Sequence, residues 1–395
     1  MKRILIVNKS FATGGIQSSM VNMANQLSKF YKVDILVYYP EGPMKGRLLP
    51  SVTVISPPWK LKAIGMTFRE AMGSKSLKIV LFRLFCSFWS KLFNNSLPLE
   101  LAMKLPEKIR CEDGKPYDLA IAFHHEQRKK TVTAGFVRFV ARCVIANKKA
   151  AWIHYDADSL DLDSSYNEPF YAAMDHIVAV SKSVMESFRH RFPALKKKTS
   201  FCYNYLDCTS LSAQSELPQA IEFEQNAIVF FSACRLTQEK GISRAIRAIA
   251  PILKRNQDIF WYIAGDGIEK ENILQCIADN GVQQQIKIIG NQENPYSFMR
   301  NANAVMNVSF HEAAPMVFLE AAVLQTPVFA TQTLSAEEML HDCNGDFICE
   351  NSEEGIRSKF EFLARNRKYL EEAKIKKKSI KPSGFDLLVF IKELL

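Results

Sequence analysis

The feature that most constrains the fold of this chain is a regular alternation of short apolar runs with longer helical stretches. The runs are three to six residues long and recur at 4–7, 33–38, 52–55, 119–123, 150–153, 177–180, 227–232, 259–264, 286–289, 304–308 and 328–330. A short, continuously apolar run predicts a strand that is buried on both faces, as the strands of parallel sheets are. The alternation therefore predicts a doubly wound α/β fold that binds its ligand at the carboxyl ends of the strands.

A polar stretch divides this pattern in two. Residues 207–226 are rich in Ser, Gln and Glu and lack periodicity, and a chain of 395 residues is long enough for two or three domains. We expect an N-terminal domain at 1–206, a linker at 207–226 and a second Rossmann-like domain at 227–375. Residues 376–395 hold a predicted terminal helix that could pack back on the N-terminal domain.

Charge and cysteine usage limit the environment and the partners. The net charge is +10 with pI ≈ 9.0, which favours an anionic partner such as nucleic acid, a membrane surface or a phosphorylated substrate. The nine cysteines form no C-x-x-C pair, as expected for reduced thiols. The run at 4–7 is too short for a secretory signal, and no apolar run reaches about 18 residues, so we predict a cytoplasmic protein without a spanning helix.

Residues 60–110 interrupt the alternation. They contain ten Lys and Arg against three Glu, interleaved with the aromatic residues Phe68, Phe82, Phe85, Phe88, Trp89 and Phe93. Basic and aromatic residues together predict an interfacial helix on an anionic membrane surface. An ordinary helical insertion, with aromatic rings in a core and solvated lysines, fits the same composition. Nucleic acid fits less well because no nucleic-acid-binding motif is present.

One loop in the second half has a spacing typical of a ligand site. Glu312 and Glu320 stand eight positions apart on either side of Pro315, after the apolar run at 304–308. The pattern predicts a strand, a tight loop containing Glu312, and a helix with Pro315 at its first turn. The unpaired N–H groups of such a helix start attract anions, so the loop could bind the hydroxyls and phosphates of a nucleotide sugar. A surface helix with a Glu cap fits the spacing equally well.

Other predicted strand ends carry glycine or polar residues. Gly14–Gly15 lies between a strand and a helix, where the absence of side chains lets a ligand approach the backbone. Arg235 and Lys240 lie in a similar loop, where two cations could clamp a diphosphate without a metal. His154 directly follows another apolar run. A metal site at 124–126 is rejected because adjacent histidines point apart and no third ligand is suitably spaced.

Taken in order, these features resemble the retaining glycosyltransferases of family four. That family has the GT-B fold, in which two Rossmann-like doubly wound parallel-sheet domains face each other across a cleft. Within the family, the chain is similar to bacterial enzymes that build capsular or other surface polysaccharides. The motifs that carry the resemblance are Gly14–Gly15, His154, Arg235 with Lys240–Gly241, Asn294–Tyr296, Glu312 with Glu320, and Thr326–Val328.

The resemblance implies a role for each motif in a donor site. Glu312 would hold hydroxyls of the donor sugar, and Glu320 would take the ribose hydroxyls. Arg235 and Lys240 would neutralise the leaving diphosphate, and His154 would lie beside the donor sugar and the reaction centre. The remaining donor contacts would come from the backbone at Gly14, Gly15, Asn291, Gln292, Ala313, Ala314, Pro315, Met316 and Val317.

The resemblance also implies a reaction. We expect a retaining transferase that moves a sugar from a nucleotide-diphosphate sugar, UDP- in preference to GDP-, to a lipid-linked glycan acceptor, without metal or cofactor. It would work at the inner face of the cytoplasmic membrane as a peripheral protein held by residues 60–110. A GT-B sugar-nucleotide epimerase and a non-catalytic nucleotide-sugar-binding scaffold are the alternatives. Cys234 and Ala313 depart from glycines that are common in the family, and these departures bear on the donor assignment.

Overall fold

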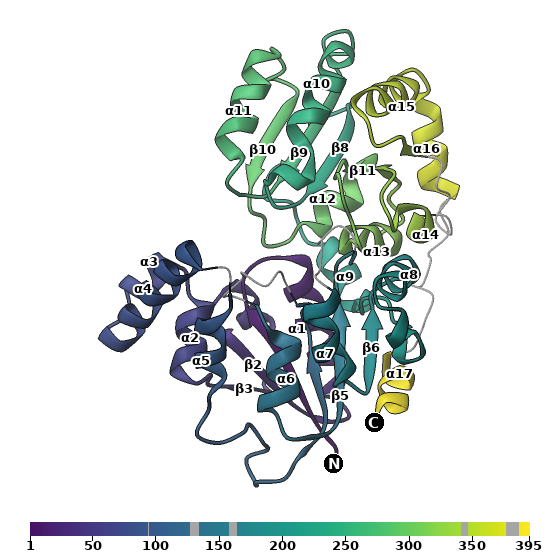
Figure 1. Ribbon diagram of the computed structural model, residues 1–395. Helices are drawn as coiled ribbons and strands as arrows, with labels where there is room; N and C mark the ends of the chain where they lie inside the picture. Colours follow the sequence, from purple (N-terminus) through teal and green to yellow (C-terminus); the bar gives the residue numbers. More distant parts are fainter. Residues whose placement is uncertain (94, 127–133, 158–163, 341–346, 377–386) are drawn as a thin grey trace. The chain divides into compact units, whose positions relative to one another are not determined.

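The computed structural model describes residues 1–395 except 94, 127–133, 158–163, 341–346 and 377–386. The chain divides into two compact units (Figure 1). The N-terminal unit contains Met1–Tyr205 and the C-terminal residues from Phe385, and the second unit is Leu206–Gly384. Each unit is built on a parallel sheet, which is the architecture that the alternating sequence pattern predicts.

The sheet of the N-terminal unit has seven strands among the described residues, in the order β3-β2-β1-β4-β5-β6-β7. The order runs outward from β1 in both directions, which places the crossover helices on both faces of the sheet. The strands are β1 (Arg3–Ser10), β2 (Lys32–Tyr39), β3 (Val52–Ile55), β4 (Tyr117–Ala122), β5 (Ala146–Ile153), β6 (His176–Ala179) and β7 (Thr199–Phe201). Ile4, Leu5, Ile6 and Val7 of β1 have no exposed surface, as a strand covered on both faces requires.

The helices of this unit form two groups. The first group connects the strands and consists of α1 (Gly15–Leu27), η1 (Pro43–Arg47), α6 (Phe136–Cys143), α7 (Ser164–Ala172), α8 (Lys182–Arg191) and η2 (Pro193–Lys198). The second group follows β3 and consists of α2 (Trp59–Gly65), α3 (Phe68–Met72), α4 (Leu77–Leu92) and α5 (Leu97–Met103). This second group is the insertion at 60–110, and α3 and α4 lie at its outer edge (Figure 1).

The second unit holds a sheet of six described strands in the order β10-β9-β8-β11-β12-β13. These strands are β8 (Ile228–Ala233), β9 (Ile259–Ala264), β10 (Ile286–Gly290), β11 (Ala304–Asn307), β12 (Val328–Thr331) and β13 (Ile348–Cys349). The helices are α9 (Cys208–Ser215), η3 (Gln238–Lys240), α10 (Ile242–Leu253), α11 (Lys270–Asp279), α12 (Tyr296–Asn301), α13 (Met316–Val323), α14 (Ala336–Leu340), α15 (Glu353–Arg365) and α16 (Arg367–Lys376). Apolar side chains form a core on each face of the sheet.

The stretch 207–226 contains a structured segment where the sequence predicts a linker. Its first part is helix α9, which Asp207 caps by accepting a hydrogen bond from the Ser210 N–H at 3.0 Å. Leu211 is buried in the core of the second unit. The helix shows little periodicity because it has only eight residues, of which Leu211 and Ser215 are buried.

The C-terminal helix belongs to the N-terminal unit. Helix α17 (Leu387–Leu394) buries Leu387, Phe390, Ile391 and Leu394. The Phe390 ring lies edge-on to Trp152 of β5, with ring centroids 5.9 Å apart. None of the described helices has both the length and the apolar composition to cross a bilayer.

Candidate functional site

A glycine turn brings two strand-end loops of the second unit together. Gly241, between η3 and α10, has φ +65, and a Cβ there would lie 2.3 Å from the Val308 carbonyl oxygen. Only glycine fits this combination of positive φ and close backbone approach. Because β8 and β11 are neighbours in the sheet, the turn places Lys240 directly beside the loop that follows β11.

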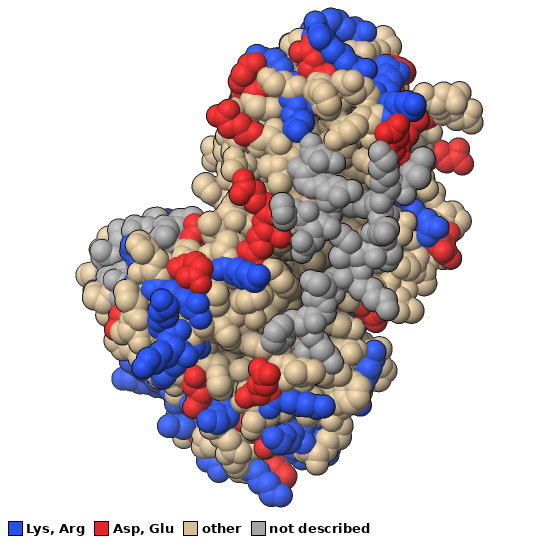
Figure 2. Space-filling view, turned by 90° about the vertical axis from the view of Figure 1, so that its right-hand side faces the viewer, with Lys and Arg blue, Asp and Glu red and all other residues tan. Residues whose placement is uncertain are grey.

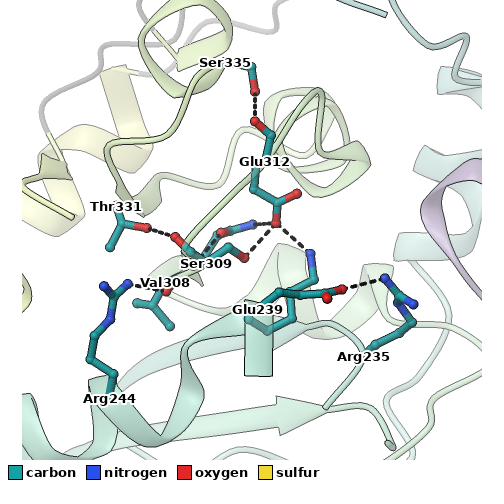
Figure 3. A network of polar contacts seen from close by, with 10 residues as sticks. Arg235, Glu239, Arg244, Val308, Ser309, Glu312, Thr331 and Ser335 are labelled. Carbon is teal, nitrogen blue, oxygen red and sulfur yellow. Dashed lines mark hydrogen bonds and ion pairs between the residues drawn. The ribbon is translucent and has the colours of Figure 1, made fainter. Parts of the chain in front are cut away.

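Glu312 lies at the centre of a hydrogen-bond network in that loop (Figure 3). Its Oε1 accepts hydrogen bonds from Lys240 Nζ at 2.7 Å, Ser309 Oγ at 2.7 Å and Asn307 Nδ2 at 3.2 Å. The Glu312 carbonyl accepts a bond from Ser335 Oγ at 3.3 Å. A carboxylate with this many donors has its position fixed before any ligand arrives.

Lys240 keeps its charge in a half-buried position. Burial by itself disfavours an ammonium group, but the carboxylate of Glu312 and its hydrogen bond raise the pKa of Lys240 above the ordinary value. The two side chains are 18% and 11% exposed, so they are screened from water far more than a surface pair. The two loops that follow β8 and β11 therefore present a fixed cation, Lys240, and a fixed carboxylate, Glu312, side by side.

Arg235 is held much more loosely than Lys240. Its Nη2 lies 2.8 Å from Glu239 Oε1, and both side chains are about half exposed, at 52% and 50%. Such a surface pair contributes only about 0.2–1 kcal/mol, so Arg235 can leave Glu239 for a stronger anion. Cys234 packs against the apolar core, and its burial raises the pKa of its thiol to about 11. The side chain that replaces the family's glycine is therefore neutral and turned toward the core.

Arg244 supports the loop from the side of α10. Its Nη2 donates to the Val308 carbonyl at 2.9 Å and to Asn351 Oδ1 at 2.8 Å, and its guanidinium lies 3.8 Å from the centroid of the Phe310 ring. Asn351 Nδ2 donates to the carbonyl of Phe310 at 2.9 Å. Thr331 of β12 adds a bond of 2.6 Å to the Ser309 carbonyl. These contacts fix the backbone on which Glu312 is carried.

Helix α13 begins where the sequence predicts it. Pro315 is its N-cap, and Met316 and Val317 form its first turn. No described side chain caps this end, so its leading N–H groups provide positive potential beside Glu312. Ala313 and Ala314 connect Glu312 to Pro315, and Glu320 lies in the second turn of the helix. Thr326–Val328, which completes the predicted motif, leads into β12.

Two further predicted contacts follow β10. Asn291 is exposed, and Gln292 Nε2 donates to the Ile289 carbonyl at 2.6 Å. Strand β10 is at the edge of the sheet, two positions from β8. Asn294 next to them bonds the Gln214 carbonyl at 2.7 Å and so ties this loop to α9.

The predicted residues of the N-terminal unit also follow strand ends. Gly14 is the N-cap between β1 and α1, and Gly15 is the first residue of α1. Gly14 has an extended backbone, so its use rests on space: a Cβ would lie 2.7 Å from Gln17 Oε1, the end of a flexible side chain. His154 follows β5, which is two strands from β1 across β4.

His154 belongs to a buried histidine cluster with His124 and His125, which follow β4. Burial lowers the pKa of His124 to about 4 and holds those of His125 and His154 well below the ordinary value. His154 packs on Phe123 with ring centroids 4.6 Å apart, and the rings of His124 and His125 are 4.4 Å apart. His154 Nε2 and His125 Nδ1 are buried without a hydrogen-bond partner among the described residues. The histidines are thus neutral at physiological pH.

The structure joins some of the predicted residues and leaves others in separate groups. Lys240 and Glu312 are in direct contact, with Arg235 and the start of α13 on the same loops. Gly14, Gly15 and His154 belong to the other unit. The sequence analysis assigned no role to Asn307, Ser309, Thr331, Ser335, Arg244 or Asn351. The sequence carried one signal for Arg244. It is a charged residue in the stretch Ile242–Leu253, where only Ser243 and Arg247 are also polar.

Two units built on parallel sheets are the architecture of the GT-B glycosyltransferases. A solved structure with this fold is Alr3699/HepE from Anabaena in complex with UDP-glucose. It superposes with a TM-score of 0.68 over 100% of this chain and 98% of that chain, at 14% sequence identity. The GT-B fold predicted from the sequence is therefore confirmed.

The family follows from the second unit. Residues 213–380 match the family model described as Glycosyl transferases group 1. The O-antigen biosynthesis glycosyltransferase WclY of Escherichia coli is 26% identical over 40% of this chain and 43% of its own length. The N-acetylgalactosamine-N,N'-diacetylbacillosaminyl-diphospho-undecaprenol 4-alpha-N-acetylgalactosaminyltransferase of Campylobacter jejuni is 24% identical over 53% of this chain and 57% of its own. The matched region thus spans about half the length of these curated relatives.

Proposed function

We propose that this protein is a retaining glycosyltransferase that moves a sugar from a nucleotide-diphosphate sugar to a lipid-linked glycan acceptor in the synthesis of a capsular or other surface polysaccharide. The observation that carries the proposal is the contact of Lys240 with Glu312 beside the start of α13. A cation on the loop after β8, together with a carboxylate and a helix start on the neighbouring loop after β11, matches the diphosphate and the hydroxyls of such a donor.

The loop supplies what the leaving group needs. The bond between the anomeric carbon and the diphosphate breaks as the sugar becomes oxocarbenium-like, and negative charge grows on the departing oxygen. Lys240, and Arg235 once released from Glu239, neutralise that charge in place of a divalent metal. Glu312 holds sugar hydroxyls, with the backbone of Ala313 to Val317 beside it, and Glu320 takes the ribose hydroxyls. We favour UDP over GDP as the nucleotide.

The N-terminal unit supplies the acceptor side. His154, kept neutral by burial, can donate or accept a hydrogen bond next to the donor sugar. The acceptor oxygen bonds the anomeric carbon from the face that the diphosphate leaves, and its proton passes to a departing phosphate oxygen. That geometry retains the anomeric configuration.

A lipid-linked acceptor agrees with the charges near the insertion. Burial lowers the pKa of Lys9, at the end of β1, and the positive charge of Arg83 on α4 lowers it further, while the carboxylate of Glu70 acts in the opposite direction. Arg83 Nε is buried without a hydrogen-bond partner among the described residues. A phosphate or diphosphate on the acceptor would relieve the repulsion between these two cations. We accordingly place the protein at the inner face of the cytoplasmic membrane as a peripheral protein.

A donor screen tests the proposal. The full chain is given a panel of UDP- and GDP-sugars with polyprenyl-diphosphate glycans, and products are analysed by mass spectrometry and by the anomeric coupling constant in NMR. We expect transfer with a retained anomer that continues in EDTA, and loss of transfer in Lys240→Ala. Lys270→Ala, a matched loss of a lysine paired to Asp266 at 3.8 Å in the same unit, serves as the control.

Four outcomes of the same screen would contradict the proposal. An inverted anomer contradicts retention, and loss of transfer in EDTA contradicts metal independence. An epimerised donor formed without acceptor indicates an epimerase, and nucleotide binding without turnover across the panel indicates a scaffold.

A further inference from the structure

Helix α4 has an apolar face directed away from the protein. Leu77, Leu81, Leu84, Phe88 and Leu92 are between 43% and 72% exposed. Their spacings of four, three, four and four residues place all five on one narrow stripe of the helix. We call these five residues the outer row.

The opposite side of α4 is already occupied. Ile79 and Cys86 are buried, and Ile79 packs in a small core with Ala63, Met66 and Ala71 of the insertion. The aromatic rings mostly pack along the helix: Trp59 lies 5.6 Å from Phe82, and Trp89 lies 4.2 Å from Phe93. The core of the insertion therefore does not use the outer row. Packing on one side of α4 accounts for the buried residues Ile79 and Cys86 but not for the exposed apolar residues of the outer row.

Charge at the margins of the outer row identifies its partner. Lys75, Lys78 and Lys91 are exposed at the two ends of α4, and the helix contains no Asp or Glu. Residues 1–205 carry 31 Lys and Arg against 16 Asp and Glu, whereas 206–395 carry 20 against 25. Figure 2, which views the molecule from a different side than Figure 1, shows Lys and Arg side chains gathered over the N-terminal unit. An apolar stripe bordered by lysines on a strongly basic unit is complementary to a bilayer with anionic headgroups.

The length of α4 decides how it meets that bilayer. Its 16 residues are fewer than the roughly 20 that a spanning helix needs, and its other side is attached to α2, α3 and α5. We propose that α4 lies in the plane of an anionic membrane, with the outer row among the acyl chains and Lys75, Lys78 and Lys91 at the phosphates. This inference deepens the membrane location proposed above and rests on it. Of the aromatic residues named in the sequence analysis, only Phe88 belongs to the outer row, and the other four members are leucines.

Vesicle binding tests the proposal. The full chain is floated with vesicles of phosphatidylcholine mixed with phosphatidylglycerol, and with phosphatidylcholine alone. We expect binding to the anionic vesicles with a part that persists at ~1 M salt, where the Debye length is only about 3 Å. Leu81→Glu with Phe88→Glu should lower the partition coefficient at least about tenfold at every salt concentration. Leu217→Glu with Ile268→Glu, which alters exposed apolar residues of the other unit, should leave it unchanged.

A second variant separates charge from insertion. Replacement of Lys75, Lys78 and Lys91 by Gln should remove the salt-sensitive part and leave the salt-resistant part. Arg83 is left intact because it is half-buried and close to Lys9. Wild-type binding by the Glu variant would overturn the proposal. So would a dimer in light scattering that the Glu variant dissociates, because the outer row would then be a contact between two copies.

The outcome is distinguishable from failure of the proposed function. The Glu variant should still turn over donor with a short-chain, water-soluble acceptor in the absence of vesicles, since none of the outer row belongs to the donor site. Vesicle binding without transfer by any variant would leave the membrane surface intact and refute the transferase.

Discussion

Two regions of the molecule lie at the carboxyl ends of parallel strands and differ in charge. The loops around Glu312 in the second unit hold an ion pair, whereas the histidine cluster of the N-terminal unit is neutral. Around Glu312 the structure provides an ammonium partner and two neutral donors, and the Glu312 carboxylate raises the pKa of Lys240. Around His154 the neighbours are Phe123 and other histidines, and burial keeps the ring neutral. One region therefore holds an ion pair, and the other holds neutral rings that can still form hydrogen bonds.

This difference predicts which substitutions should affect function and which should affect stability. In the second unit, a lost charge should affect function first, because its partner then loses the group that holds it in place. In the N-terminal unit, a gained charge should affect stability first. Burial lowers the pKa values of His125 and His154, and no carboxylate among the described residues acts to raise them. The four tests below address the comparison in order of expected effect.

The largest effect is expected from the Lys240–Glu312 pair. Either single alanine variant should lower transfer by ~10²–10³-fold, as loss of one preorganised electrostatic group does. Each should also cost up to about 3 kcal/mol of stability because one charge remains half-buried and unpaired. The double variant Lys240→Met with Glu312→Leu should regain stability but not transfer. Denaturant melts and transfer rates for the wild type, Lys240→Met, Glu312→Leu and their double variant complete the cycle, with Arg357→Met and Glu354→Leu as an exposed control pair. Full activity in either single variant would contradict the proposed role of the Lys240–Glu312 pair in transfer.

Acid should destabilise the protein through the histidines. Their folded pKa values lie below the unfolded value of about 6.5, so the unfolded chain binds more protons and stability falls as pH drops below that value. For His124 the loss continues to about pH 4 and reaches roughly 3 kcal/mol. Glu126, whose pKa burial raises, opposes this at lower pH. Urea unfolding between pH 7.5 and 5 measures the slope; His124→Gln should flatten it and His311→Gln, an exposed histidine, should not. An unchanged slope in His124→Gln would show that the ring is not neutral in the fold.

Loss of Arg244 should loosen the donor-side loop without removing any group that touches the donor. Arg244→Ala deletes three hydrogen bonds and the stack on Phe310, and we expect roughly a tenfold fall in kcat/KM with a stability loss of about 2 kcal/mol. Arg247→Ala, one turn along α10 with its side chain 52% exposed, is the control and should stay within about 0.5 kcal/mol of the wild type. A positioning role predicts that kcat falls more than KM rises. Equal effects in both variants would exclude it.

The smallest effect concerns Arg235. Glu239→Gln should free its guanidinium and tighten nucleotide-sugar binding by about two- to fivefold, since an exposed pair contributes less than about 1 kcal/mol. Calorimetric titration with the donor and its nucleoside diphosphate measures the change. Glu354→Gln, the same loss from an exposed pair elsewhere in the unit, should have no effect. Weaker binding in Glu239→Gln would mean that Glu239 contributes to the site directly.

The sequence by itself determined the sheets and the strand ends. Runs such as Ile4–Val7 leave no polar face, so they can form only strands covered on both sides, and the residues that follow them must gather at one edge. That reasoning placed Lys240, Glu312 and His154 correctly in loops after strands. It failed at 207–226, where an eight-residue helix buries too few residues to show a period.

Only the tertiary structure decided which groups meet and which surfaces remain open. The contact of Lys240 with Glu312 spans 72 positions in sequence and depends on β8 lying next to β11. The partners Asn351 and Arg244 are separated by 107 positions. The sequence of α4 is apolar around much of its circumference, so no periodicity could tell its packed face from its exposed one. The packing of α2, α3 and α5 against α4 settles that choice, because Ile79 and Cys86 are buried and the outer row remains in solvent.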